Sequence, residues 1–198
     1  MIIKKAAVFH GYGSTPSRVR WLSDALRKLN VEVEVPKLPQ PLVRAYEYVA
    51  SLNLDVDLFA GHSMGGALAL IMAAKKSKPA IAVAPPTNLK FQLDYMKTNP
   101  NLRRIYEEIT SIVKEEEMER LSPINFKYEK PILIIHGTTD RVVPIEQSRE
   151  FCKQVLSCKL VEIDGMGHSP HNEDERRRVN IAIEEFIEAL RSNEDHNR

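Results

Sequence analysis

Short apolar segments alternate along the chain with longer segments in which apolar residues recur every three or four positions. The short segments predict six strands, at Ala6–His10, Val31–Val35, Val56–Ala60, Ala80–Ala84, Ile132–His136 and Lys159–Ile163. Four of these segments are almost continuously apolar, which is typical of parallel strands that are covered on both faces. Val31–Val35 alternates valine with glutamate instead, which suits an edge strand with one wetter face.

The longer segments predict helices between these strands. The helices are expected at Ser17–Leu29, Leu42–Leu52, Met64–Lys76, Ile145–Leu156 and Asp174–Arg191, and the polar tail Asn193–Arg198 is expected to fray. Because strands and helices alternate with short connections, we expect right-handed crossovers and a doubly wound α/β sheet. A chain of 198 residues is long enough for one domain with a substantial core and short for two.

One long segment interrupts this alternation. Residues 87–130 carry no strand pattern, and within them Leu102–Met118 places apolar residues on one helical face. The acidic run Glu115–Glu117 is expected on the solvated side of that helix. Because open α/β sheets bind ligands at the carboxyl ends of their strands, and this segment leaves such an end, we interpret it as a helical lid over a site.

Charge and cysteine content narrow the class of protein. The formal net charge is +1, so no global field attracts nucleic acid or an anionic membrane surface. Lys4 and Lys5 split the apolar residues of the N-terminus, which does not resemble a signal peptide, and the run Ala67–Ala74 is too short to span a bilayer. We therefore expect a cytoplasmic protein in which Cys152 and Cys158 are reduced thiols.

A serine lies at a sharp corner between the third predicted strand and the helix that follows it. The residues Gly61-His62-Ser63-Met64-Gly65 fit the pattern G-x-S-x-G. Such a corner forces the serine into a strained backbone conformation and exposes its hydroxyl above the sheet edge. The flanking backbone segments approach each other closely there, which favours glycine at positions 61 and 65.

A serine hydroxyl becomes a strong nucleophile when a base accepts its proton and an acid orients the base. Asp140 follows the fifth predicted strand and His168 follows the sixth, so both loops leave the same sheet edge as Ser63. Asp164 competes with Asp140 for the role of the acid, because it lies only four residues before His168. We favour Asp140, since it follows a separate buried strand and can approach the far nitrogen of the ring.

Attack on a carbonyl places negative charge on its oxygen, which backbone N–H groups can stabilise. We expect one N–H from Met64, which follows the serine, and another from Tyr12, in the glycine-rich loop after the first strand. We interpret most of the other five histidines as core-edge or surface residues, and these five are His10, His62, His136, His171 and His196.

These segments together resemble the α/β-hydrolase superfamily, and within it the small single-domain serine esterases. The matching pieces are "HGYGS" (10–14), "GHSMGG" (61–66), "HGTTDRVVP" (136–144) and "GMGHS" (165–169), in family order over nearly the whole chain. The resemblance implies a minimal α/β-hydrolase fold, with six parallel strands, helices on both faces and no counterpart of the family's first two strands. It also implies Ser63 as nucleophile, Asp140 as acid, His168 as base, and Tyr12 and Met64 as oxyanion donors.

The function that this resemblance implies is hydrolysis of small carboxylic esters with short to medium acyl chains, without a metal or organic cofactor. A thioesterase, a lipase or a small-amide hydrolase could use the same three side chains. A non-catalytic binding protein on a hydrolase scaffold is an alternative from another class. A peptidase ranks below the esterase, because these 198 residues hold no large substrate-gating domain.

Overall fold

The computed structural model describes residues 1–193, and the rest of the expected fraying tail lies outside the described residues. Its centre is one sheet of six parallel strands in the order β2-β1-β3-β4-β5-β6. The strands are β1 (Lys5–Phe9), β2 (Glu32–Glu34), β3 (Leu58–His62), β4 (Ala80–Val83), β5 (Ile132–Gly137) and β6 (Cys158–Ile163). This sheet confirms the predicted minimal α/β-hydrolase fold, with the alternating Val31–Val35 segment at one edge.

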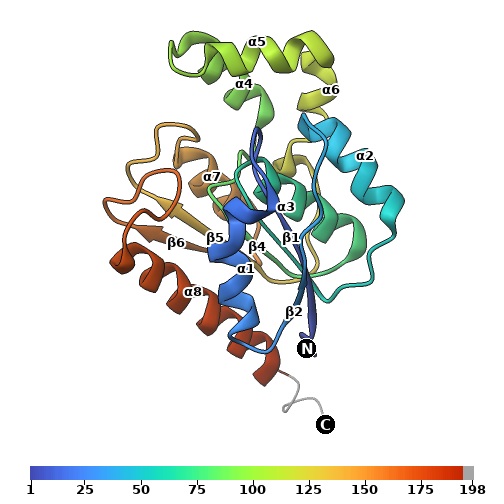
Figure 1. Ribbon diagram of the computed structural model, residues 1–198, viewed down its shortest axis with the longest axis vertical. Helices are drawn as coiled ribbons and strands as arrows, with labels where there is room; N and C mark the ends of the chain where they lie inside the picture. The colour runs from blue at the N-terminus through green and yellow to red at the C-terminus, as the bar shows by residue number, and fades with distance from the viewer. Residues whose placement is uncertain (194–198) are drawn as a thin grey trace.

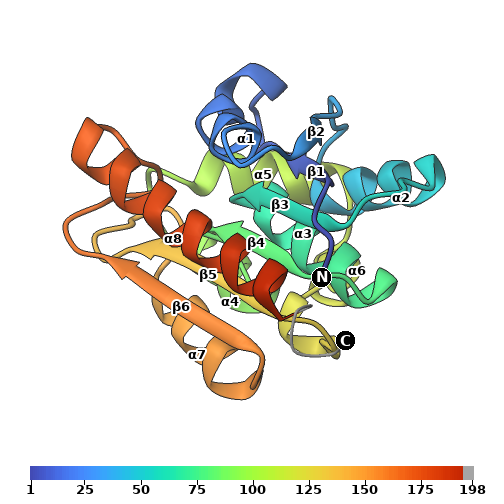
Figure 2. The ribbon, with the colours of Figure 1, turned by 90° about the horizontal axis from the view of Figure 1, so that it is seen from below.

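Helices cover both faces of the sheet (Figures 1 and 2). One face packs against α1 (Arg20–Arg27), which follows the 3₁₀ turn Pro16–Val19, and against α8 (Glu173–Ser192). The other face packs against α2 (Leu42–Leu52), α3 (Met64–Lys76) and α7 (Glu146–Gln154). The sheet therefore separates two apolar layers, as a doubly wound fold requires.

The sequence of each helix matches its position. Helix α3 is buried from Met64 to Ala73, which explains why its residues there are apolar on every side of the helix. Helix α8 is amphipathic and buries one stripe, including Val179, Ile183 and Phe186. The side chain of Asn172 caps α8 by accepting a hydrogen bond of 2.8 Å from the backbone N–H of Glu175.

Residues 87–130 form three helices beyond the carboxyl end of the sheet (Figure 1). They are α4 (Leu89–Thr98), α5 (Arg103–Ile112) and α6 (Glu115–Glu119), followed by the 3₁₀ turn Pro123–Asn125. The single helix predicted over Leu102–Met118 is wrong, because the backbone is extended at Val113 and Lys114. The acidic run forms the first turn of α6, where the helix dipole favours negative charge. Helix α4 was not predicted.

Strand β3 begins two residues later than its sequence pattern predicts. Asp57 lies before the strand and accepts hydrogen bonds of 2.9 Å from the backbone N–H groups of Lys4 and Lys5. The carboxylate thereby caps the start of β1, while the backbone N–H of Asp57 donates to the Lys5 carbonyl oxygen at 2.9 Å. The shift moves His62 into β3 and leaves Ser63 as the first residue after the strand.

The expectation of two reduced thiols is wrong, because Cys152 and Cys158 form a disulfide. Helix α7 ends at Gln154 and β6 begins at Cys158, so the short return brings the two Cα atoms to 4.9 Å. The reduced-thiol argument for a cytoplasmic location is thereby lost. Among residues 1–193, no helix combines the length and the apolar character needed to cross a bilayer.

Candidate active site

Ser63 lies at the corner between β3 and α3 in a strained conformation, with φ 58° and ψ −122°. Close backbone packing requires the glycines on either side. A Cβ atom added to Gly61 would lie 2.0 Å from the carbonyl oxygen of Gly65, and one added to Gly65 would lie 2.1 Å from that of Phe9. The local sequence therefore permits this corner only because both positions lack a side chain.

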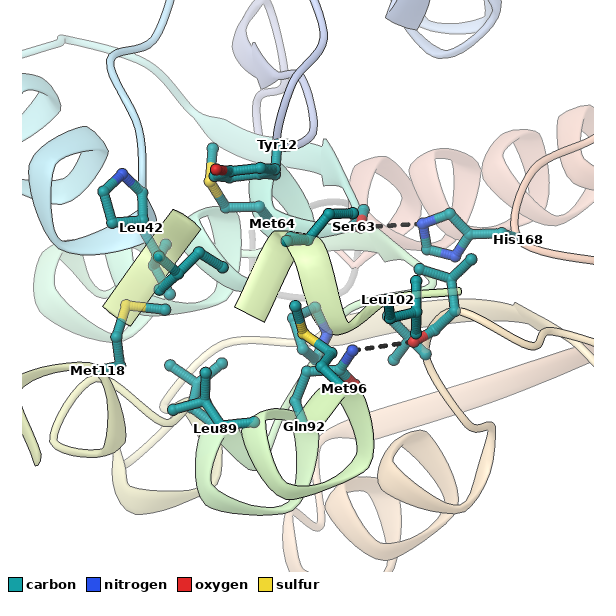
Figure 3. Close-up of a pocket in the computed structure, with 17 residues that line it drawn as sticks. Tyr12, Leu42, Ser63, Met64, Leu89, Gln92, Met96, Leu102, Met118 and His168 are labelled. Carbon is teal, nitrogen blue, oxygen red and sulfur yellow. Dashed lines mark hydrogen bonds between the residues drawn. The ribbon is translucent and has the colours of Figure 1, made fainter. Parts of the chain in front are cut away.

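The structure brings Ser63, His168 and Asp140 together at the carboxyl edge of the sheet. His168 Nε2 lies 2.9 Å from Ser63 Oγ, and His168 Nδ1 lies 2.8 Å from Asp140 Oδ2 (Figure 3 shows the first of these contacts). Because Nδ1 faces a carboxylate, it carries the proton, and the lone pair of Nε2 faces the hydroxyl. Asp164 accepts a hydrogen bond from Thr138 Oγ1 at 3.2 Å instead, so the geometry favours Asp140 over Asp164 as the partner of His168.

The Asp140 side chain is fully buried and has hydrogen-bond partners at both carboxylate oxygens. Its Oδ1 accepts the backbone N–H groups of Val142 and Val143 at 2.8 and 2.9 Å. Burial alone would raise the pKa of Asp140, but hydrogen bonds from His136 and His168 outweigh it and hold the pKa well below its usual range. The carboxyl is therefore ionised, and it can stabilise positive charge on His168.

His136 is a member of this site that sequence interpretation missed. It lies on β5, fully buried, and its Nε2 is 3.1 Å from Asp140 Oδ2 and 2.9 Å from the carbonyl oxygen of Val143. Its Nδ1 is 2.6 Å from Ser148 Oγ on α7. The one available signal was its position, four residues before Asp140 at the end of a buried strand.

His62 is a second residue that was missed, although it directly precedes Ser63. Its Nε2 lies 2.7 Å from the backbone carbonyl oxygen of His168, and the two rings are 4.8 Å apart. Burial, together with the charge that His168 can carry, lowers the pKa of His62 to about 4. A neutral His62 ring therefore donates its Nε2–H to the loop that carries His168.

The loop after β1 lies beside Ser63, as the sequence predicts. A Cβ atom added to Gly11 would be 3.4 Å from Ser63 Cβ, and Gly13 donates its N–H to Gln40 Oε1 at 2.6 Å. Tyr12 and Met64 both line the cavity next to the serine (Figure 3). Within residues 1–193, neither of their backbone N–H groups donates a hydrogen bond to a protein acceptor.

A cavity of about 210 Å³ lies against Ser63 and His168, under the α4–α6 segment. Its lining is largely apolar and includes Pro41, Leu42, Leu89, Met96, Ile109 and Met118. Figure 3 shows Leu42, Leu89 and Met118 on the side of the cavity away from His168. None of the 17 lining residues is Asp, Glu, Lys or Arg, so the cavity suits an uncharged, apolar group.

The described residues contain no group of three or more His, Cys, Asp or Glu side chains arranged to hold a metal ion. The chemistry available at this site is that of a buried carboxylate, an imidazole and a hydroxyl in series, beside two backbone N–H donors. This arrangement can deliver the serine oxygen to an electrophilic carbon and move its proton to His168.

A family model described as the prolyl oligopeptidase family matches residues 42–188. This chain belongs to the prolyl oligopeptidase family. One relative of this chain, esterase/lipase 2 of Mycoplasma pneumoniae, is 23% identical to it over 82% of this chain and 75% of its own length. Relatives of this name and hydrolase neighbours place the chain among esterase-like α/β-hydrolases.

Solved structures similar to this prolyl oligopeptidase family member have the same fold. Est1E from Butyrivibrio proteoclasticus has a TM-score of 0.70 and 22% identity, over 96% of this chain and 89% of that one. Alpha/beta hydrolase domain-containing protein 10 from mouse has a TM-score of 0.76 and 14% identity, over 96% and 92%. At these identities the likeness shows the α/β-hydrolase fold.

Proposed function

We propose that this chain is a serine hydrolase that cleaves carboxylic esters with short to medium acyl chains through an acyl-enzyme on Ser63. The observation that carries the proposal is the hydrogen-bonded series from Ser63 through His168 to a buried, ionised Asp140. The esterase/lipase names of relatives support the reaction class. The apolar cavity beside Ser63 supports an uncharged small-molecule ester as the substrate.

In the first half of the reaction, Ser63 Oγ attacks the ester carbonyl carbon while His168 Nε2 accepts the hydroxyl proton. Asp140 stabilises the resulting imidazolium without itself taking the proton. The carbonyl oxygen becomes negative and receives hydrogen bonds from the backbone N–H groups of Tyr12 and Met64. The intermediate then collapses to an acyl-enzyme, and the alcohol leaves with the proton of His168.

In the second half, a water molecule replaces the alcohol. His168 accepts a proton from the water as the oxygen attacks the acyl carbon, and the same two N–H groups stabilise the second oxyanion. Collapse of this intermediate releases the carboxylic acid and returns the proton to Ser63 Oγ. Every proton transfer uses His168, so the rate falls when this ring is protonated.

The cavity supports a limited acyl length. An apolar cavity of roughly 150 Å³ holds one benzene molecule, so about 210 Å³ corresponds to a chain of roughly eight carbons. Each buried methylene contributes about 0.8 kcal/mol, which favours medium over very short chains. In this proposal residues 87–130 are an insertion in a single domain. They act as a lid that shields the bound acyl chain of the substrate from water.

A peptidase is the second candidate, because the family match carries that name. The absence of charged side chains from the cavity lining disfavours recognition of a peptide terminus. A panel of 4-nitrophenyl esters from acetate to palmitate, an octanoyl thioester and a prolyl 4-nitroanilide separates the candidates. We expect the highest kcat/KM at six to eight acyl carbons, and a preference for the prolyl anilide would overturn the esterase proposal.

The direct test is covalent labelling with a fluorophosphonate probe. We expect the folded protein to be labelled at Ser63, and Ser63→Ala to lose both the label and ester hydrolysis. Ser157→Ala is a matched control, because it removes a buried hydroxyl that lacks a hydrogen-bond partner among the described residues. A folded protein that is not labelled would support the binding-protein alternative.

A further inference from the structure

Asp140 Oδ2 lies between two histidines, and the proposed reaction uses only one of them. We infer that His136 and Ser148 are positioning residues, so that the functional unit is the series Ser148, His136, Asp140, His168 and Ser63. The four contacts along this series measure 2.6, 3.1, 2.8 and 2.9 Å. The inference rests on the proposed function, because it assigns His136 and Ser148 the task of holding Asp140 for His168.

The contacts of His136 fix its tautomer. Nε2 faces two acceptors, the Asp140 carboxylate and the Val143 carbonyl oxygen, so it carries a proton. The two acceptors share the hydrogen bond from this N–H group. In the neutral ring Nδ1 is then an acceptor, and the hydroxyl of Ser148 donates to it. Ser148 and His136 are both fully buried, so water does not compete for these contacts.

Few charged or titratable groups face this unit. Asp140 is the only carboxylate in contact with the His136 or His168 ring among the described residues. The ring of His62 is the other titratable group that faces His168. Glu162 on β6 also acts on His136, but it pairs with Arg149 on α7 at 2.5 Å. His136 therefore acts on Asp140 through its Nε2–H, and this contact holds the carboxylate in place for His168.

Each oxygen of Asp140 therefore has a separate task. Oδ1 is held by the N–H groups of Val142 and Val143, which place the carboxylate in its loop. Oδ2 accepts hydrogen bonds from His136, on β5, and from His168, in the loop after β6. The contact with His136 thereby aligns this oxygen with His168 Nδ1. His136 also takes part of the acceptor capacity of Oδ2. Loss of its N–H would leave that oxygen to His168 alone and stabilise the imidazolium form of His168.

The experiment compares His136→Leu, His136→Gln and Ser148→Ala with the matched control Ser157→Ala. For each variant, kcat and KM are measured with a 4-nitrophenyl ester from pH 4 to 9, and folding is checked by thermal unfolding. We expect His136→Leu to lower kcat by about 10–100-fold, as loss of an outer hydrogen-bond partner does at metal sites, with little change in KM. The acid limb of its kcat/KM profile should move to higher pH.

The other variants separate positioning from general damage. His136→Gln keeps an N–H donor and should recover most of kcat, whereas Ser148→Ala should lose a few-fold with an unmoved KM. Ser157→Ala should match the unmodified protein. A merely structural role lowers the fraction of active protein and scales the rate equally at every pH.

The inference is overturned if folded His136→Leu keeps the kcat and the acid limb of the unmodified protein. If His136→Leu does not fold, Ser148→Ala decides, and the inference is overturned when its kcat equals that of Ser157→Ala. Fluorophosphonate labelling of the unmodified protein distinguishes this failure from failure of the proposed function. A labelled Ser63 with unaffected variants contradicts the positioning role alone, whereas an unlabelled Ser63 contradicts the hydrolase.

Discussion

Two regions of opposite character meet at Ser63. Below it, the fully buried Asp140 carboxylate is hydrogen-bonded to His136 on β5 and to His168 in the loop after β6. Above it, the α4–α6 segment presents apolar side chains to the cavity. That segment meets the loop after β1 through an exposed hydrogen bond of 3.0 Å from Tyr12 to Glu108, and its ion pair Arg104–Glu108 is exposed as well.

The difference shows where the molecule tolerates change. A buried polar network loses much of its value when one partner is removed, because the remaining groups keep their desolvation cost. The packing of the apolar side chains in α4–α6 depends on their volume and shape. One hydrophobic residue there can replace another of similar size with a small loss of stability. Changes near Asp140 should therefore alter the rate of the chemical step, whereas changes in α4–α6 should alter which ester is preferred.

The largest effect is expected from Asp140→Asn. The amide cannot hold His168 in the tautomer that accepts the serine proton, and the equivalent substitution in serine proteases lowers kcat by about 10⁴-fold. Asp164→Asn, measured in the same assay, should change kcat less than about twofold, because Asp164 contacts Thr138 and not His168. A larger loss in Asp164→Asn than in Asp140→Asn would show that the acid has been misassigned.

The next largest effect is expected from Gly65→Ala, which tests the corner that carries Ser63. The added Cβ would lie 2.1 Å from the Phe9 carbonyl oxygen, so β1 and α3 must separate. We expect the free energy of unfolding to fall by about 3 kcal/mol in urea denaturation. Gly167→Ala is the control, since nothing lies within 4 Å of its added Cβ, and equal losses in both variants would contradict the packing argument.

A comparable effect, visible only in acid, is expected from His62. Its pKa is lowered from 6.5 to about 4 by burial and by the charge of His168, so the unfolded chain binds a proton between these values and the folded chain does not. The free energy of unfolding should therefore fall by about 3 kcal/mol as the pH drops from 6.5 to 4. His62→Gln should lose less stability over this window, and parallel curves for both proteins would exclude the effect.

The smallest effect is expected from Met96→Ala in α4. Met96 lines the cavity and is 6% exposed, so its truncation enlarges the space beside Ser63 and costs about 2 kcal/mol of stability. The best acyl chain should lengthen by one or two carbons, while kcat on a short ester and its pH profile stay within about threefold. An unchanged chain preference would show that α4 does not bound the acyl site.

The two regions also differ in how far their structure could be predicted from the sequence. Ser63 and Asp140 each follow a buried apolar strand, and His168 follows the partly exposed edge strand β6. Because parallel strands bring their carboxyl ends to one edge, local strand patterns predict that the three loops share that edge. The contacts of His62 and His136 were missed because they depend on how the loop after β6 and helix α7 pack, and the place of His136 four residues before Asp140 was the one local signal.

The α4–α6 segment was predicted less well for a physical reason. Apolar residues from Leu102 to Met118 fit one helical face, but burial of Val113 and the three N-terminal glutamates of α6 favour a break. Helix α4 has a weak apolar pattern and is fixed by packing over the cavity. The Cys152–Cys158 bond likewise depends on a tight helix-to-strand return that cysteine spacing does not reveal.

The central claim is that Ser63 carries the acyl group during turnover. The most direct measurement is rapid acid quenching of the protein with 4-nitrophenyl octanoate, followed by intact mass and peptide mass spectrometry. We expect an added octanoyl group on the peptide that contains Ser63, absent in Ser63→Ala, together with a burst of 4-nitrophenol. Turnover without any acylated peptide, at a rate that Ser63→Ala retains, would contradict the claim.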